Sequence, residues 1–173
     1  TQLLRLLSNT ALQLNVEFLK ISDQMTGDKT VDHFKQFYHS FEEIKNNHYD
    51  GIIITGAPVE KQEFEAVAYW QELCDVLEWA KSHVFSSLYI CWGAQAALYY
   101  HYGIKKSAPS NKISGVFSHN VNNRQHPIVR GFDDLFYAPH SHYTAIARED
   151  VRAIPQLEIL AESSEAGVYL ISD

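Results

Sequence analysis

The chain has 173 residues, of which 46% are hydrophobic, so it is long enough to bury one sizeable core. Its 14 basic and 21 acidic residues give a net charge of −7, and no run rich in Lys and Arg occurs, which argues against a nucleic-acid-binding protein. No apolar run reaches the roughly 18 residues of a membrane span, and no signal-peptide pattern opens the sequence. We therefore expect a cytoplasmic protein without a membrane partner.

Hydrophobic spacing in the first 103 residues predicts alternating helices and strands. Phe34, Phe37 and Phe41 recur at helical spacing, whereas Gly51 to Thr55 form a β-branched run typical of a strand buried on both faces of a parallel sheet. The predicted elements are a helix at 2–7, a half-buried strand at 14–21, helices at 31–46 and 66–81, a strand at 51–55, and a strand, turn and helix at 87–100 closed by Gly103.

The second half of the sequence is richer in strands. Short β-rich runs at 112–117, 135–139, 157–160 and 167–171 are separated by turn residues, and the last two predict a hairpin across 163–167. Alternating strands and helices followed by strands indicate one α/β domain with a largely parallel sheet. In such sheets ligands bind beyond the carboxyl ends of the strands.

The two cysteines differ in their surroundings and show neither a disulfide framework nor metal-ligand spacing, so no metal site is expected. Cys74 shares a predicted helical face with Trp70, Leu73 and Leu77, which indicates a core position. Cys91 lies at a sharp turn between a strand and a helix. A helix N-terminus favours the thiolate, which is the nucleophilic form of cysteine.

Trp92 and Gly56 are predicted to lie next to Cys91. Backbone N–H groups of Trp92 and of the Gly56 turn, at the end of the neighbouring strand, are placed to form an oxyanion hole. The residues alone leave a second interpretation open, because free cysteines are commonly buried in cores and Gly56 also suits a plain strand-to-helix turn.

The segment from Tyr89 to Gln95, YICWGAQ, resembles the nucleophile motif of class I glutamine amidotransferase-like folds, with Tyr89 where those enzymes usually carry glycine. Four further blocks, at 1–7, 50–60, 131–141 and 159–170, resemble the homoserine O-acyltransferase family in the family's order. The resemblance implies a flavodoxin-like α/β fold, with a mostly parallel sheet flanked by helices and a β-rich C-terminal half. It also implies Cys91 as the acyl-thioester nucleophile, acyl-CoA as co-substrate and no permanently bound cofactor.

The resemblance assigns roles to three more residues. In the family, glycine at the position of Glu60 accompanies succinyl-CoA and glutamate accompanies acetyl-CoA, since a carboxylate would repel the free carboxylate of a succinyl group. Lys112 and Ser141 match positions that bind the amino-acid acceptor. From the residues alone, Glu60 and Lys112 suit solvated surface positions and Ser141 suits a turn. His142 stands where many members carry arginine, which leaves serine open as an alternative acceptor.

The family does not use His119 or His140 as the base, so we expect structural roles for both. Its general base and partner belong to a His-Pro-Glu-Tyr-Asp block beyond the position of Asp173. Residues 1–173 are therefore expected to be a single acyltransferase domain lacking that block and the first strand. The resemblance implies transfer of an acyl group, with acetyl favoured, from acyl-CoA to L-homoserine in methionine biosynthesis, and it suggests a homodimer. A serine O-acetyltransferase of cysteine biosynthesis, a homoserine O-succinyltransferase and a catalytically silent fragment remain alternatives.

Overall fold

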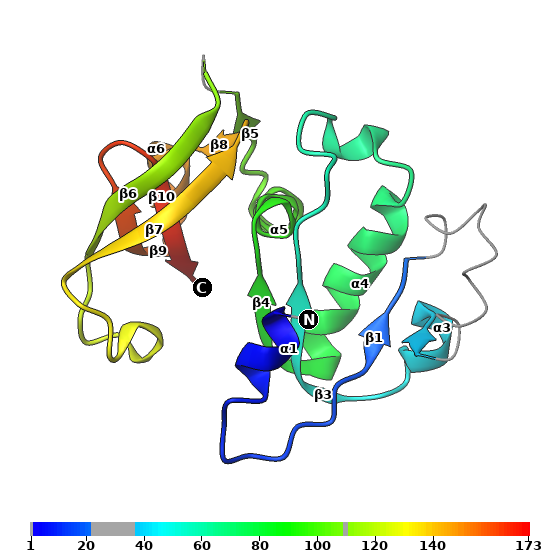
Figure 1. The fold of residues 1–173 in the computed structure, drawn as a ribbon. Coiled ribbons are helices and arrows are strands. Elements are labelled where there is room, and N and C mark those ends of the chain that lie inside the picture. Colours follow the sequence, from blue (N-terminus) through cyan, green and yellow to red (C-terminus); the bar gives the residue numbers. More distant parts are fainter. Residues whose placement is uncertain (1, 22–36, 109–110) are drawn as a thin grey trace.

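The computed structural model describes residues 2–21, 37–108 and 111–173 of this α/β protein (Figure 1). The helices are α1 (Gln2–Leu7), α3 (Phe41–Ile44), α4 (Trp70–His83), α5 (Trp92–Tyr102) and α6 (Arg148–Arg152), with 3-10 turns η2 (Phe64–Ala66) and η3 (Pro127–Val129). The strands are β1 (Phe18–Leu19), β2 (Tyr38–His39), β3 (Tyr49–Ile54), β4 (Val84–Tyr89), β5 (Lys106–Ser107), β6 (Ile113–Val121), β7 (Leu135–His142), β8 (Ala145–Ile146), β9 (Glu158–Ser163) and β10 (Gly167–Ser172).

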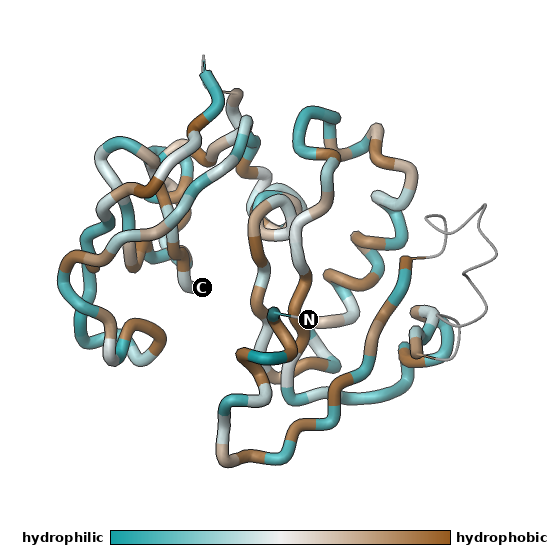
Figure 2. Tube along the Cα trace, viewed as in Figure 1, coloured by the Kyte–Doolittle hydropathy of each residue, from teal (hydrophilic) through white to brown (hydrophobic). Residues whose placement is uncertain are grey.

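A parallel pair of strands forms the centre of the N-terminal half. Strands β3 and β4 pair with Ile52 opposite Ser87 and Ile54 opposite Tyr89, and Figure 2 shows apolar residues along both. Helix α4 runs alongside this pair because its apolar residues, including Leu73 and Leu77, recur at helical spacing and are buried. Both strands end at the same edge, so the loops that follow them lie next to each other.

One apolar cluster holds this edge in place. It joins residues of η2, α4 and α5 around the buried indole of Trp92, and its members are Phe64, Val67, Tyr69, Leu73, Leu77, Trp92, Ala96 and Ala97. The alanines of α5 let the helix lie close to its neighbours. The start of α5 is therefore anchored by a buried aromatic side chain and packed by small ones.

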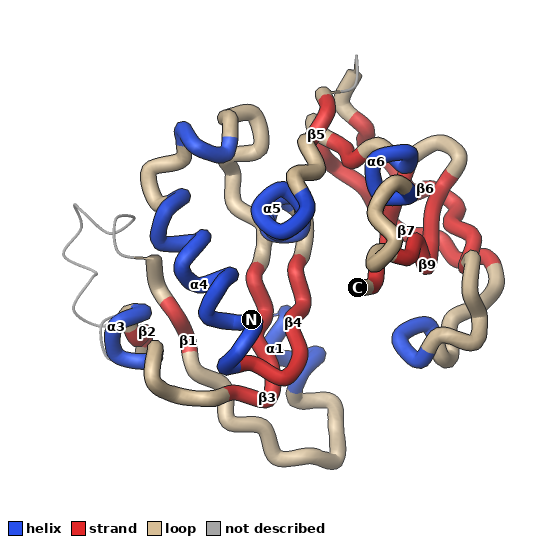
Figure 3. Tube along the Cα trace, turned by 180° about the vertical axis from the view of Figure 1, so that it is seen from behind, coloured by secondary structure: helices blue, strands red, loops and turns tan. Residues whose placement is uncertain are grey.

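The C-terminal half is an antiparallel sheet with strand order β10-β9-β6-β7. Seen from both sides, α5 lies between this sheet and α4 (Figures 1 and 3). The predicted hairpin across 163–167 is confirmed, with Gly167 opposite Ser163. Strands β6 and β7 place Ser114 opposite Ser141 and Ile113 opposite His142.

The predicted α/β class and β-rich second half are confirmed, but several boundaries were wrong. The strand predicted at 14–21 is reduced to β1, Phe18–Leu19. Of the helix predicted at 31–46, residues 31–36 lie outside the described part, and helix α3 begins only at Phe41. The reason is Ser40, whose backbone N–H donates to Glu43 Oε2 at 2.6 Å and so fixes the start of the helix.

The expected burial of β3 on both faces was also wrong. None of its residues is fully buried, and Phe85 on the adjacent β4 is 93% exposed. Among the described residues β3 pairs only with β4, and α4 covers one side of the pair. The β-branched run therefore reflects strand propensity rather than two covered faces. Within the described ranges, every helix is too short or too polar to cross a membrane.

Candidate active site

Cys91 has the most unusual backbone of the described residues. Its φ and ψ are 58° and −124°, and no other non-glycine residue described has a positive φ. Such a conformation is costly for a residue with a Cβ atom and commonly marks a functional turn. Cys91 is the N-cap of α5, and its side chain is exposed. The predicted strand, sharp turn and helix are thus present, with the thiol displayed at the turn.

Two glycines allow the backbone to close around this thiol. A Cβ atom added to Gly56 would lie 3.0 Å from Cys91 Cβ and 3.1 Å from Cys91 Sγ. A Cβ atom on Gly93 would lie 2.7 Å from the carbonyl oxygen of Ile54 and 2.9 Å from that of Thr55. Gly93 therefore lets α5 pack directly on the end of β3, and Gly56 lets its loop reach the cysteine.

The Trp92 amide lies in the same corner. Its nitrogen is 3.5 Å from the position of a Cβ atom on Gly56. Trp92 is the first residue of α5, and the first N–H groups of a helix have no intrahelical partner. Among the described residues no side chain hydrogen-bonds to the Cys91 thiol. The corner therefore combines an exposed thiol, a glycine turn and a helix N-terminus.

Glu60 is half-buried and holds two loops together. Its Oε2 accepts a hydrogen bond of 3.0 Å from the Tyr143 backbone N–H, although the two residues are 83 positions apart. Its carbonyl oxygen accepts a hydrogen bond of 2.7 Å from Lys106 Nζ, which also donates to the Gln62 carbonyl. Burial lowers the pKa of Lys106. Glu60 thus occupies a bridging position rather than a freely solvated one.

Lys112 and Ser141 flank the same residue, Tyr143. Lys112 Nζ lies 5.1 Å from the Tyr143 ring centroid, and Lys61 Nζ lies 3.9 Å from it. Ser141 is exposed and lies two residues before Tyr143 at the end of β7. Two ammonium groups are therefore gathered at Tyr143, two residues from the Ser141 hydroxyl, and groups of these kinds suit a carboxylate ligand.

A pair of hydrogen bonds connects this segment to the helix of Cys91. Gln95, one turn after Cys91, donates from Nε2 to the Thr144 carbonyl at 3.3 Å and accepts from Thr144 Oγ1 at 3.0 Å. Thr144 is only 5% exposed. We refer to residues 141–144 as the acceptor segment, because they include Ser141, which the sequence predicts to bind the acceptor. The amide of Gln95 fixes one end of this segment to α5, and Glu60 fixes its middle.

His119 and His140 do not contact Cys91. Their Nε2 atoms are 2.8 Å apart, and His140 Nδ1 lies 3.0 Å from His142 Nε2. His119 is fully buried, and burial lowers the pKa of both His119 and His140. These histidines form a chain that leads to Thr144 rather than to the thiol.

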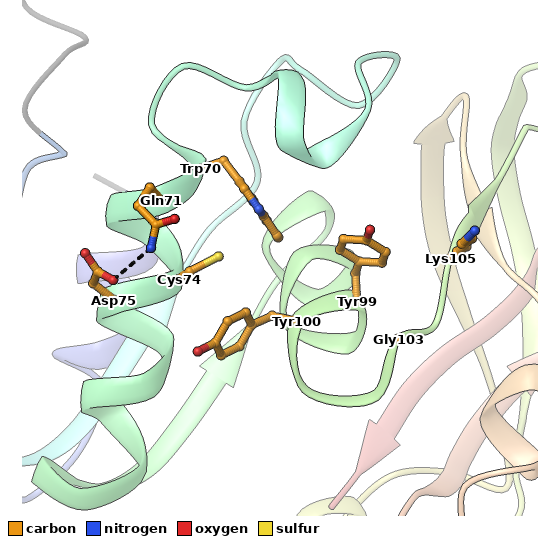
Figure 4. A pocket seen from close by; sticks show the side chains of 8 residues that line it. All are labelled: Trp70, Gln71, Cys74, Asp75, Tyr99, Tyr100, Gly103 and Lys105. Carbon is orange, nitrogen blue, oxygen red and sulfur yellow. Dashed lines mark hydrogen bonds between the residues drawn. The ribbon is translucent and has the colours of Figure 1, made fainter.

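An open pocket of about 560 Å³ lies between α4 and α5, and Cys91 is not among the residues that line it (Figure 4). Its lining residues are Trp70, Gln71, Cys74, Asp75, Tyr99, Tyr100, Gly103 and Lys105. The expected core position of Cys74 is confirmed, since it is 7% exposed. Burial raises the pKa of its thiol to about 11, which keeps it protonated and unreactive near neutral pH. Of the two cysteines, only Cys91 is exposed.

The structure gathers the residues singled out from the sequence into two adjacent groups. One contains Cys91, Gly56 and Trp92, and the other contains Glu60, Lys112 and Ser141. The residues that join them, Gln95, Tyr143 and Thr144, were missed as functional residues because their contacts span 49 or more positions of sequence. Only the position of Gln95 within the motif from Tyr89 to Gln95 could have drawn attention to it.

Comparisons with known proteins identify the family of this chain. The family model described as "Homoserine O-succinyltransferase" matches residues 1–173. A homoserine O-acetyltransferase of Lachnospira eligens is 58% identical over 170 residues, which cover 98% of this chain and 55% of that protein. A homoserine O-acetyltransferase of Agathobacter rectalis is 53% identical over 172 residues, covering 99% of this chain and 56% of that protein. The chain thus spans about half the length of the curated relatives it matches.

Solved structures support the fold. A glutamine amidotransferase from Thermotoga maritima has a TM-score of 0.59 and 13% identity, covering 87% of this chain and 67% of its own. The glutaminase domain of Trypanosoma brucei CTPS has a TM-score of 0.58 and 12% identity, covering 90% of this chain and 79% of its own. These likenesses establish a class I glutamine amidotransferase-like fold. The family model that matches residues 1–173 and the 58% identity to the Lachnospira eligens relative show that the chain belongs to the homoserine O-succinyltransferase family.

Proposed function

We propose that this chain carries the acyl-transfer site of an acyl-CoA:L-homoserine O-acyltransferase of methionine biosynthesis, with acetyl-CoA as donor. The observation that carries the proposal is the exposed Cys91 thiol on a strained backbone at the N-terminus of α5, with Gly56 pressed against it. This is the geometry required of a nucleophile at a turn between strand and helix. The cytoplasm and a homodimer are the corresponding expectations for location and assembly.

In the first half-reaction the Cys91 thiolate attacks the thioester carbonyl carbon of acyl-CoA. A new carbon–sulfur bond forms, the bond to the CoA sulfur breaks, and CoA leaves as its thiolate. The oxyanion of the tetrahedral intermediate accepts hydrogen bonds from the backbone N–H groups of Trp92 and of the Gly56 turn. The closeness of Gly56 to Cys91 Sγ supports this role.

In the second half-reaction the acceptor hydroxyl attacks the acyl-cysteine. Lys112 pairs with the carboxylate of the amino acid, Ser141 hydrogen-bonds and positions it, and the second ammonium group at Lys61 adds to the attraction. The hydroxyl proton passes to a general base, and the Cys91 thiolate is released. We propose a histidine of a segment beyond Asp173 as that base, as the family resemblance implies.

The acetyl preference rests on Glu60 and on the names of relatives. A carboxylate near the acyl group repels a succinyl group, which carries a carboxylate of its own. The relatives from Lachnospira eligens and Agathobacter rectalis are both named homoserine O-acetyltransferase. We therefore favour the acetyl donor over the succinyl donor that the family's name indicates.

The test is steady-state kinetics on the protein expressed from its complete gene. We expect transfer from acetyl-CoA to homoserine with the parallel double-reciprocal lines of a ping-pong mechanism, and a lower kcat/KM for serine. Cys91→Ala should abolish transfer. Intersecting lines, or activity retained in that variant, would contradict the covalent mechanism, and a higher kcat/KM for serine would favour the serine acetyltransferase.

Two variants of Glu60 separate its charge from its bridging contact. Glu60→Gln removes the charge but keeps an oxygen that can accept from the Tyr143 N–H, whereas Glu60→Gly removes both. We expect both variants to raise kcat/KM for succinyl-CoA relative to acetyl-CoA, and only Glu60→Gly to raise the KM for homoserine. Unchanged donor ratios in both variants would remove Glu60 as the donor determinant.

A further inference from the structure

Three histidines form a continuous hydrogen-bonded chain that ends on the acceptor segment. His119 Nδ1 lies 3.0 Å from the Phe117 carbonyl oxygen, and the Nε2 atoms of His119 and His140 are 2.8 Å apart. The chain continues from His140 Nδ1 to His142 Nε2 at 3.0 Å, and from His142 Nδ1 to the Thr144 carbonyl oxygen at 2.8 Å. All six ring nitrogens are therefore used in four contacts.

The number of protons in this chain follows from its two ends. Both ends are carbonyl oxygens, which can only accept, and each of the four contacts needs one proton between its two atoms. Three neutral imidazoles carry only one N–H proton each, so one contact must lack its proton. Four complete hydrogen bonds require a fourth proton, and hence one imidazolium charge shared by the three rings.

Burial decides which contact lacks a proton in the neutral chain. His119 is fully buried against Phe136 and Tyr169, whereas His142 is only half-buried. An unmade hydrogen bond costs least where water can replace the missing partner. The Thr144 residue is buried, but its carbonyl oxygen keeps a second donor, Gln95 Nε2, so the contact from His142 Nδ1 to Thr144 is the one whose loss leaves no buried atom unpaired. In the neutral chain this contact is open, and His142 holds Thr144 only when the fourth proton is bound.

We propose, on the basis of the acyl transfer proposed above, that His119, His140 and His142 act together as a positioning unit that holds one shared proton and thereby fixes the acceptor segment for homoserine binding. The unit acts through Thr144, whose carbonyl oxygen is also bonded by Gln95 of α5. None of these histidines is a catalytic residue in this scheme. They control how firmly Ser141 is presented to the acceptor.

The surroundings of His119 and His140 disfavour their charged forms. Burial lowers the pKa of both His119 and His140, the latter also through the charges of its two histidine neighbours. Of the other titratable groups, the Tyr169 phenol of β10 faces the rings of His119 and His140. Glu60, Lys61 and Lys112 contact Tyr143, the residue that follows His142. On α6 and β9, Arg148 pairs with Glu162 at 2.5 Å.

The chain arrangement also differs from that of a metal site. Within residues 2–21, 37–108 and 111–173, no group of three or more His, Cys, Asp or Glu side chains could hold a metal ion. The rings of His119 and His140 are nearly parallel, with planes 9° apart, and their Nε2 atoms are 2.8 Å apart. The three rings therefore bind a proton in series rather than converging on one point.

The first test is nuclear magnetic resonance of the complete protein labelled with ¹⁵N in histidine, with the rings assigned by single substitutions. Between pH 8 and pH 5 we expect the three rings to gain one proton in total, in a single common transition. Three independent midpoints, or no proton gained by any of the rings, would overturn the shared proton. This readout does not depend on enzyme activity.

The second test uses two substitutions of His142 with opposite effects. His142→Arg supplies N–H donors to both His140 and the Thr144 carbonyl at every pH, so all contacts are made with two neutral histidines. His142→Leu removes both contacts and the need for a fourth proton. The exposed His48 provides a control, as His48→Gln should behave like wild type.

We expect the wild-type KM for homoserine to rise about fivefold as the pH increases through the shared titration. It should stay low in His142→Arg and high in His142→Leu, while the rate of CoA release without acceptor keeps its wild-type pH profile in both. A KM that follows the wild-type pH profile in His142→Arg would overturn the positioning role. If homoserine accepts no acyl group at all, the proposed function fails, and the ring titration still decides whether the proton is shared.

Discussion

Replacing Cys91 by glycine should make the protein inactive but more stable. Cys91 is held at φ 58° and ψ −124°, a region where glycine is comfortable and residues with a Cβ atom are strained. Strain of this kind costs about 1–3 kcal/mol. Because the Cys91 side chain is exposed, its removal sacrifices little buried apolar area.

The expected gain is the strain released minus the entropy that glycine adds to the unfolded chain. That entropy lowers stability by about 0.4–1 kcal/mol. The net increase in the free energy of unfolding for Cys91→Gly is therefore about 1 kcal/mol. For a protein domain of about 150–250 residues, this corresponds to a rise in Tm of about 2–4 °C.

Denaturant unfolding of the complete protein would measure this difference. Cys91→Ala is the matched control, since it removes the thiol but keeps the Cβ atom and the strain, and its stability should stay within about 0.5 kcal/mol of wild type. Ser86→Gly, at an exposed position of β4, should lower stability by about 0.5–1 kcal/mol. If Cys91→Gly lowers stability as much as Ser86→Gly does, the turn is not strained, which removes the main support for a nucleophile turn.

Three further substitutions or modifications test the packing around the site. Gly93→Ala should lower the free energy of unfolding by at least about 2 kcal/mol, because the added Cβ atom would lie 2.7 Å from the Ile54 carbonyl oxygen. Urea unfolding would measure this loss, and a neutral effect would contradict the close packing of α5 on β3. Thr144→Val keeps the side-chain shape and the backbone carbonyl but loses the hydrogen bond from the Thr144 hydroxyl to Gln95, so the KM for homoserine should rise about fivefold with unchanged acylation. A change confined to acylation would refute the role of Thr144 in homoserine binding. Iodoacetamide at pH 8 should alkylate Cys91 and spare Cys74, because burial raises the pKa of the Cys74 thiol to about 11. Peptide mass mapping would measure the labelling, and equal labelling of both cysteines would contradict the burial of Cys74.

The local features of the site were predictable because they are written in neighbouring residues. The strand, sharp turn and helix around Cys91 follow from an apolar β-rich run, a glycine and a series of helix formers within 14 residues, Ser87 to Tyr100. The left-handed cap at Gly103, with φ 69°, and the hairpin ending in Gly167 follow from glycine in the same way. Helix α4 followed from its apolar spacing.

The contacts that assemble the site were not predictable in this way. Glu60 meets Tyr143 across 83 positions, and Gln95 meets Thr144 across 49, so neither pair leaves a periodic signal in the sequence. The boundary of α3 depended on a side chain, Glu43, that bonds back to Ser40. Hydrophobic periodicity reports which face of an element is apolar, but it does not report which distant loop will cover a polar group.

The histidine chain shows the same limit. His140 and His142 are two residues apart, so a strand places both on one face, and this much follows from the sequence. Their partner His119 lies on β6, and the antiparallel register pairs His119 with Phe136, His140 with Gly115 and His142 with Ile113, which places all three histidines on one face of the sheet. A register of this kind has to be observed in the structure.

The central claim is that Cys91 carries the acyl group, and intact-mass spectrometry tests it most directly. The complete protein and its Cys91→Ala variant would be mixed separately with acetyl-CoA and with succinyl-CoA, without acceptor. We predict one acetyl adduct on the wild-type protein, located to Cys91 by peptide mapping and discharged by homoserine, and little succinyl adduct. No adduct from either donor, or an adduct that persists in Cys91→Ala, would contradict the account.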